Sequence, residues 1–258
     1  MRFSDNQESS NIHNRFSSFY EACREKDNLD VQLMNIGAEL VRLGISRVVS
    51  VCLLHKHYDI RSDEKMFRVF GSYSYADMAV SDVPQSSTAI SWRVHSGSLV
   101  PILYCADKKF ELNRNAVSQL NKVALLLEDM GVSDTFGFSI RSAEIFGSDT
   151  LYENSSTEAR ASLTSKIPEL FPTNAIYEPS SFSFEERDGV VLVCAQKACA
   201  KCPSCLGSIT ENHDTTKSIE VEDLFQLGIS MEFNGKRSIR SLKDLVNVAD
   251  RKVNSVTL

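Results

Sequence analysis

The chain has 258 residues, of which 42% are hydrophobic and 24% charged, and its formal net charge at pH 7 is −6. This composition is typical of a globular protein with a substantial core and excludes a disordered chain. The negative charge and the lack of a basic stripe argue against a nucleic-acid partner. No apolar run approaches the roughly 20 residues that cross a bilayer, and the start is too polar for a secretory signal. We therefore expect a cytoplasmic protein with no membrane partner.

The N-terminal part predicts two packed helices. Apolar residues recur at steps of three and four from Ile12 to Cys23 and again from Leu33 to Leu43, which is the spacing of one helix face. Gly44 follows the second run, at a position where a left-handed residue commonly ends a helix.

Strands follow this helical segment. The β-branched and apolar run at 47–54 predicts a strand buried on both faces, and residues 66–75 alternate more clearly. The runs 90–94 and 99–105 flank the turn sequence HSGS and predict a hairpin.

The second half mixes one helix with further strands. A long helix is predicted from about Asn113 to Met130, with Gly131 at its end. Residues 135–141 alternate like a strand, whereas the polar, Ser/Thr-rich stretch 147–166 predicts a loop or an exposed helix. Residues 181–194 predict a hairpin with Asp-Gly at its turn.

Helices separated from runs of strands predict an α+β fold, with a largely antiparallel sheet, packed N-terminal helices and one long internal helix. We expect an N-terminal helical segment at 1–44, an α+β core domain at 45–206 and a polar, partly helical appendage at 207–258. The long helix and the presence of only 11 glycines argue against a small closed barrel.

The most specific chemical signal is the pair His55 and His57 in the stretch LLHKHYDI. Alternate residues of a strand point to the same side, so both imidazoles would continue the face of Val49, Val51 and Leu53. If that face is interior, the two rings converge on one small volume. Two neutral imidazole nitrogens held on a rigid element suit a first-row metal ion. The alternative is that both histidines are ordinary polar residues at a strand end.

Further ligands for this pair can be sought nearby. Glu64 or Asp59 would supply a third ligand, and His95 a fourth if its hairpin lies alongside. The histidine pair followed by Glu64 and Gly71 resembles, in part, the first metal motif of the cupin barrels. That resemblance covers only this short segment, and it implies a two-histidine, one-carboxylate site for iron, manganese or zinc.

A cysteine cluster provides the second candidate site, although seven cysteines are too few for a disulfide scaffold. Cys199, Cys202 and Cys205 are each separated by two residues, a spacing that lets thiolates reach one ion or one another. Cys194, His213 or the histidine pair would complete a set of four ligands. Four interpretations stay open: thiolate-bound zinc or another metal, a reversible disulfide, an iron–sulfur cluster, and thiols without a special role.

Together these signals predict a soluble intracellular protein that binds a divalent metal ion, with zinc first and iron or manganese as alternatives. If the protein is an enzyme, the ion would act on a small-molecule substrate, with Glu64 as ligand or general base. The alternatives are a non-catalytic structural or interaction protein with a cysteine-bound zinc loop, and a thiol redox protein. Whether it is an enzyme, and its oligomeric state, stay open.

Overall fold

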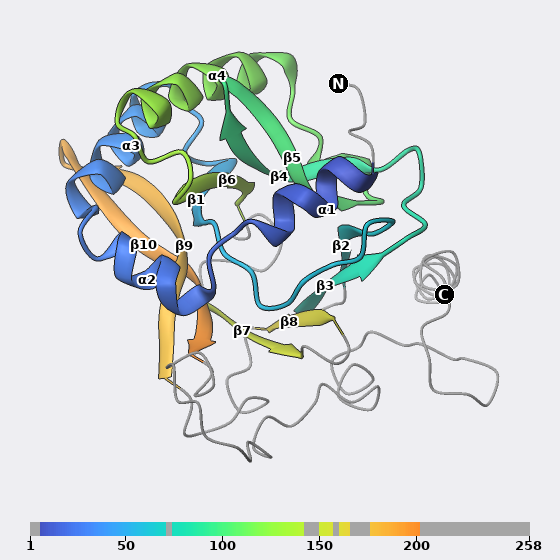
Figure 1. The fold of residues 1–258 in the computed structure, drawn as a ribbon. Coiled ribbons are helices and arrows are strands. Elements are labelled where there is room, and N and C mark those ends of the chain that lie inside the picture. The colour runs from blue at the N-terminus through green and yellow to red at the C-terminus, as the bar shows by residue number, and fades with distance from the viewer. Residues whose placement is uncertain (1–5, 71–73, 142–149, 157–159, 166–175, 202–258) are drawn as a thin grey trace, which may run out of the picture.

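In the computed structural model, the strands of the protein close into a barrel (Figure 1). The structure describes residues 6–70, 74–141, 150–156, 160–165 and 176–201. Ten strands lie in these residues: β1 (Val49–Leu53), β2 (Lys65–Phe70), β3 (Ser74–Val80), β4 (Thr88–His95), β5 (Ser98–Cys105), β6 (Phe136–Ile140), β7 (Leu151–Ser156), β8 (Ala161–Ser165), β9 (Ile176–Arg187) and β10 (Val190–Lys201). Around the barrel they follow the order β1, β6, β4, β5, β2, β3, β8, β7, β10 and β9, and β9 pairs with β1 to close the ring.

The predicted fold class, α+β on a largely antiparallel sheet, is therefore wrong, and so is the expectation against a closed barrel. Most neighbouring strands are antiparallel, but β2 runs parallel to β5 and β7 parallel to β10. Register shifts in β4 and β10 supply irregularities that bend strands without requiring extra glycines. An alternating sequence pattern indicates that a segment is a strand, but it does not indicate which strands lie beside it. The closure of the sheet into a barrel therefore could not be predicted from this pattern.

Four α-helices accompany the described strands: α1 (Asn6–Asn14), α2 (Phe19–Lys26), α3 (Asp30–Arg42) and α4 (Arg114–Asp129), with a short 3₁₀ helix η1 (Lys108–Phe110). The helical stripe from Ile12 to Cys23 is divided between α1 and α2, because Ser18 and Glu21 form a reciprocal cap that begins a new helix. The long internal helix is confirmed. Asn113 caps its first turn, and Gly131 just beyond its end has a φ of +67°.

Both predicted hairpins are confirmed. β4 and β5 pair directly across a short turn, as do β9 and β10. In the second hairpin, Asp188 and Gly189 form the turn with φ values of +53° and +76°, which is the left-handed conformation that Asp-Gly favours.

The barrel has an apolar outer layer on one side and a polar interior. In Figure 1, α3 and α4 lie together against this side, where α3 packs on β1, β9 and β10 and α4 on β4 and β5. The main core contains residues from both the helices and the strands beneath them. Its fully buried members include Ile36, Leu40, Leu120, Leu127, Val51, Phe138 and Phe184. Toward the interior, the hydroxyl groups of Ser50, Ser139 and Ser181 bond to one another across β1, β6 and β9. The alternating strands therefore turn polar side chains inward, away from the helices.

The Ser/Thr-rich stretch predicted as a loop or an exposed helix contains β7 and β8 instead. Ser162, Thr164 and Ser165 of β8 are buried, with exposures of 4% or less. Polar residues on the inner face of a barrel give the same composition as an exposed loop, which explains the error. This correction matters for function, because β7 brings Glu153 into the interior.

No helix in the described part of the chain combines the length and hydrophobicity needed to cross a membrane. The appendage predicted at 207–258 lies outside the described residues.

Candidate metal centre

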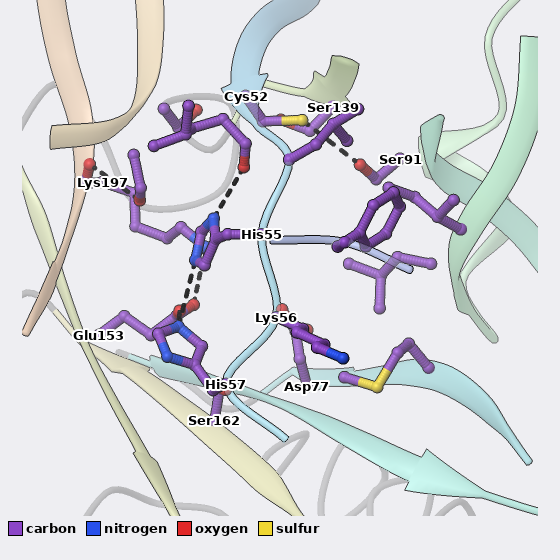
Figure 2. Close-up of a pocket in the computed structure, with 18 of the residues that line it drawn as sticks. Cys52, His55, Lys56, His57, Asp77, Ser91, Ser139, Glu153, Ser162 and Lys197 are labelled. Carbon is purple, nitrogen blue, oxygen red and sulfur yellow. Dashed lines mark hydrogen bonds and ion pairs between the residues drawn. The ribbon is translucent and has the colours of Figure 1, made fainter. Parts of the chain in front are cut away.

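Four side chains from separate parts of the chain meet inside the barrel: His55 and His57 just after β1, Glu153 on β7 and Cys199 on β10. One ligand atom from each lies within 4.8 Å of all the others. Figure 2 shows His55, His57 and Glu153 pointing toward one another, with Lys197 beside them. We call these four residues the His/Glu/Cys cluster.

The histidine rings are aimed by the end of β1. Within that strand, Cys52 lines the interior cavity, whereas Val51 belongs to the core beneath the helices. Strict alternation would have placed the rings on the Val51 face. Because the strand stops at Leu53, the chain after it turns both rings toward the interior cavity. The two rings do converge on one small volume, as the sequence predicted, and Leu53 of the predicted face lines the same cavity.

Each ring presents its Nε2 atom to the same point. His55 Nδ1 lies 2.8 Å from the Leu53 carbonyl oxygen, so Nδ1–H donates to it and Nε2 is left with a free lone pair. His57 Nε2 lies 3.1 Å from His55 Nε2. Phe19 of α2 packs on both rings, with centroid distances of 4.7 and 5.8 Å, and holds them in place.

Glu153 divides its two oxygens between the cluster and a supporting layer. Oε1 lies 3.0 Å from His57 Nε2 and 3.0 Å from Cys199 Sγ. Oε2 accepts hydrogen bonds from Lys197 Nζ at 2.7 Å and from Thr164 Oγ1 at 3.1 Å. The carboxylate is therefore oriented by groups that are not ligands themselves, as is common around protein-bound metals.

Cys199 sits directly opposite Glu153 in the parallel register of β10 and β7. Its Sγ lies 3.6 Å from His55 Nε2 and 3.1 Å from Ser180 Oγ, and the residue is fully buried. A tetrahedral zinc ion with bonds of 2.0 to 2.3 Å keeps its ligand atoms roughly 3.3 to 3.7 Å apart. Four of the six pairs of ligand atoms in the cluster lie 3.0 to 3.6 Å apart, which comes close to that range, and all six lie within 4.8 Å.

The electrostatics of the cluster suit a cation. Burial, together with His57 and Lys197, lowers the pKa of His55 to about 3, so this ring is neutral at pH 7. Burial opposes ionisation of Glu153, but the Lys197 ammonium and the His57 hydrogen bond hold the pKa of this carboxyl well below its usual range. Burial and the Glu153 charge raise the pKa of Cys199 well above its usual value. The cluster thus offers a neutral imidazole, a carboxylate and a thiol whose proton a metal ion would displace.

Other residues proposed from the sequence lie elsewhere. The Glu64 carboxylate pairs with Arg160 and accepts from the Arg61 backbone N–H, so it is not among the cluster residues. Cys194 is exposed on β10, away from the cluster. His95 is exposed at the end of β4.

The remaining candidates from the sequence lie away from the cluster or outside the described residues, except for Cys199. Asp59 pairs with Lys56. Gly71, Cys202, Cys205 and His213 lie outside the described residues. Of the four cysteines predicted to act together, the structure places Cys199 in the His/Glu/Cys cluster, and it joins the histidine and cysteine signals into one site.

Sequence reasoning missed Glu153 and the role of Lys197. Glu153 is the only acidic residue of β7, and it lies in the stretch interpreted as exposed. A segment of strand length that carries a single acidic residue within a Ser/Thr-rich stretch is the signal that could have found it. Lys197 is recognisable only once its pairing with Glu153 is known.

Comparison with known proteins does not assign this chain to a family. No family model, no curated protein and no solved structure matches it.

Proposed function

We propose that the protein binds one divalent metal ion, zinc in the first place, through His55, His57, Glu153 and Cys199. The observation that carries this proposal is the convergence of four ligand atoms of three chemical types within 4.8 Å. A buried mixture of this kind is costly to maintain unless its groups are paired or bind an ion.

The donor set favours zinc. Two imidazole nitrogens, one thiolate and one carboxylate oxygen are all ordinary zinc ligands, and four of them fill a tetrahedral shell. The carboxylate and the thiolate together neutralise the two charges of the ion. A hard cation such as magnesium or calcium prefers oxygen ligands and fits this set poorly.

Four protein ligands are typical of a structural ion, since catalytic zinc sites keep a position for water or substrate. The ion would tie the segment after β1 to β7 and β10, and thus join segments far apart in the chain. We propose this structural role as the main function of the site.

A catalytic role is the second candidate. A cavity of about 120 Å³ borders the cluster and is also lined by Arg68, Asp77 and Lys197. Its volume corresponds to a few water molecules or a very small polar molecule. In this interpretation one of the four ligands leaves the ion when a small substrate binds.

Metal analysis of the full chain, purified without a histidine tag, tests the proposal. We expect one zinc ion per chain, lost in His57→Ala and in Cys199→Ser. Glu64→Gln and Cys194→Ser are the matched controls and should keep the metal. Metal that persists in both cluster variants, or a wild-type protein that binds none when zinc is offered, would contradict the site.

Cobalt substitution separates the two roles. Cobalt bound at the cluster should show a thiolate-to-cobalt charge-transfer band, which Cys199→Ser abolishes. If the site is structural, added azide leaves the visible spectrum unchanged, whereas a site that exchanges a ligand for a small anion shifts its bands. Near-ultraviolet circular dichroism shows whether each variant keeps its native packing.

A further inference from the structure

The β9–β10 hairpin extends beyond the part of the barrel in which β10 has a neighbour on both sides. β10 pairs with β9 along its whole length, but it pairs with β7 only at 197–199. No described strand pairs with this second edge of β10 at 190–196. In Figure 1 this end of the hairpin lies on the outer side of the molecule, next to α3. β10 therefore keeps a free edge before it reaches β7.

The backbone of this free edge has hydrogen-bonding groups that no described strand satisfies. The two-residue turn at 188–189 closes the hairpin, so the even-numbered residues that follow it in β10 form the hydrogen-bonded pairs with β9. The N–H and C=O groups of Val191 and Val193 therefore point away from β9. Thr150 confirms this direction, because its hydroxyl donates to the Ala195 C=O at 3.2 Å.

The side chains of the free edge are apolar and exposed. Three of the five exposed large hydrophobic residues in the described part of the chain lie here: Val190, Leu192 and Val193, with exposed fractions of 58%, 38% and 44%. The segment 190–196 contains no charged residue and no proline. Natural sheet edges usually carry such residues, because they prevent pairing with another chain. This edge lacks that protection.

We propose that two copies of the chain pair through this edge, with their β10 strands antiparallel about a two-fold axis at Leu192. In this register Val191 of each copy lies opposite Val193 of the other, and the two pairs form four backbone hydrogen bonds. An axis at Val193 would instead bring the turn of the second copy against β7, which joins β10 at 197–199. The position of β7 therefore selects the register.

A second copy fits this edge because the edge is complementary to itself. Across the axis Leu192 meets its own counterpart and Val190 meets Cys194, so no like charges face each other. Two-fold dimers are also the commonest assemblies of identical chains. The paired segment is short and buries less than the roughly 800 Å² per partner of a stable interface, so we expect a weak dimer. The proposal is independent of the metal centre, whose residues lie outside 190–196.

A disulfide across the axis tests the register. Opposite residues of a non-hydrogen-bonded antiparallel pair have Cα atoms about 4.5 Å apart, a separation that a disulfide spans. We therefore expect mild oxidation to convert Leu192→Cys into a covalent dimer on a non-reducing gel. Cys194 should not link two wild-type chains, because its two copies would lie about 14 Å apart along the strands. Leu125→Cys is the matched control, since Leu125 is 53% exposed on α4, and it should link no more than wild type.

Removing a backbone donor tests the hydrogen bonds. The Val193 N–H points away from β9, so Val193→Pro removes two of the four bonds between the copies and none within the hairpin. Sedimentation from roughly 10 µM to roughly 1 mM should show a monomer–dimer equilibrium of the wild type. The dissociation constant should rise about tenfold or more in Val193→Pro. Leu192→Lys places two like charges on the axis and should have the same effect, whereas Leu125→Lys should have none.

Three results would overturn the proposal. They are a wild type that stays monomeric over this range, equal cross-linking of Leu192→Cys and Leu125→Cys, and a dimer that neither Val193→Pro nor Leu192→Lys weakens. A monomer would leave the free edge to an extended segment of a different protein. Circular dichroism at a concentration where all variants are monomers should match that of the wild type. Leu192→Lys keeps the test decisive if proline disturbs the hairpin.

Discussion

Replacing Lys197 with methionine tests whether a metal ion neutralises the buried carboxylate of Glu153. Lys197 Nζ lies 2.7 Å from Glu153 Oε2, and the two side chains are only 16% and 3% exposed. At an effective dielectric constant of 20, their direct attraction is about 6 kcal/mol, part of which offsets the cost of desolvation. Removing one partner of such a pair costs about 3–5 kcal/mol. We expect Lys197→Met to lose that much unfolding free energy when a chelator is present.

Bound zinc should reduce this loss, because the ion supplies positive charge next to Glu153 Oε1. The remaining cost is one charge-assisted hydrogen bond to Oε2, about 2 kcal/mol. Urea unfolding at pH 7, followed by circular dichroism with zinc and with chelator, measures both values. Lys109→Met is the control, since its pair with Asp107 is 66% and 41% exposed and should contribute less than about 1 kcal/mol in either condition. An equal loss for Lys197→Met with and without zinc would show that no ion lies next to the Glu153 carboxylate.

Three further predictions follow from buried groups. Zinc added at pH 7 should release about one proton per site from the Cys199 thiol, because burial and Glu153 raise the pKa of this thiol. A pH indicator should detect a smaller release of protons in Cys199→Ser. Burial lowers the pKa of His13 to about 4, so the unfolded chain, with a value near 6.5, binds more protons between these pH values. His13 should therefore contribute about 3 kcal/mol to the fall in unfolding free energy between pH 6.5 and pH 4, in addition to the contribution of His55, whose pKa is lowered in the same direction. His13→Gln should reduce the fall by that amount, and an unchanged slope would exclude a contribution from His13. A Cβ atom on Gly137 would lie 2.5 Å from the Trp92 backbone oxygen, so Gly137→Ala should lower the unfolding free energy by about 1–3 kcal/mol, as measured by thermal or urea unfolding. An unchanged unfolding free energy would show that the strands can separate locally.

Local elements could be predicted from the sequence where one signal determined them. α4 carries a cap, an apolar stripe and a terminal glycine, and the turn of the β9–β10 hairpin carries Asp188 and Gly189. These patterns depend on neighbours in the chain, so no long-range information is needed. The order of strands around the barrel depends on pairings such as that of Val51 with Phe182, and nothing within either segment indicates its partner.

The residues of the candidate site also divide into those that a local sequence pattern indicates and those that depend on strand pairing. His55 and His57 stand out because two histidines at alternate positions after an apolar strand are uncommon, and Cys199 stands out by its spacing to other cysteines. Glu153 lies among serines and threonines, and its burial becomes visible only when β7 is placed beside β10. The sequence favours Glu64 instead, because it lies near the histidines along the chain, yet Arg160 holds its carboxylate.

The order in which the ligands occur along the chain has a consequence for biosynthesis. His55 and Cys199 are 144 positions apart, and the second lies in the last described strand of the barrel. A ribosome therefore makes both histidines long before the thiol that completes the set. A nascent chain that ends before β10 would offer only three of the four proposed ligands, so tight capture of an ion would mark a chain that has been synthesised through the last barrel strand that the structure describes.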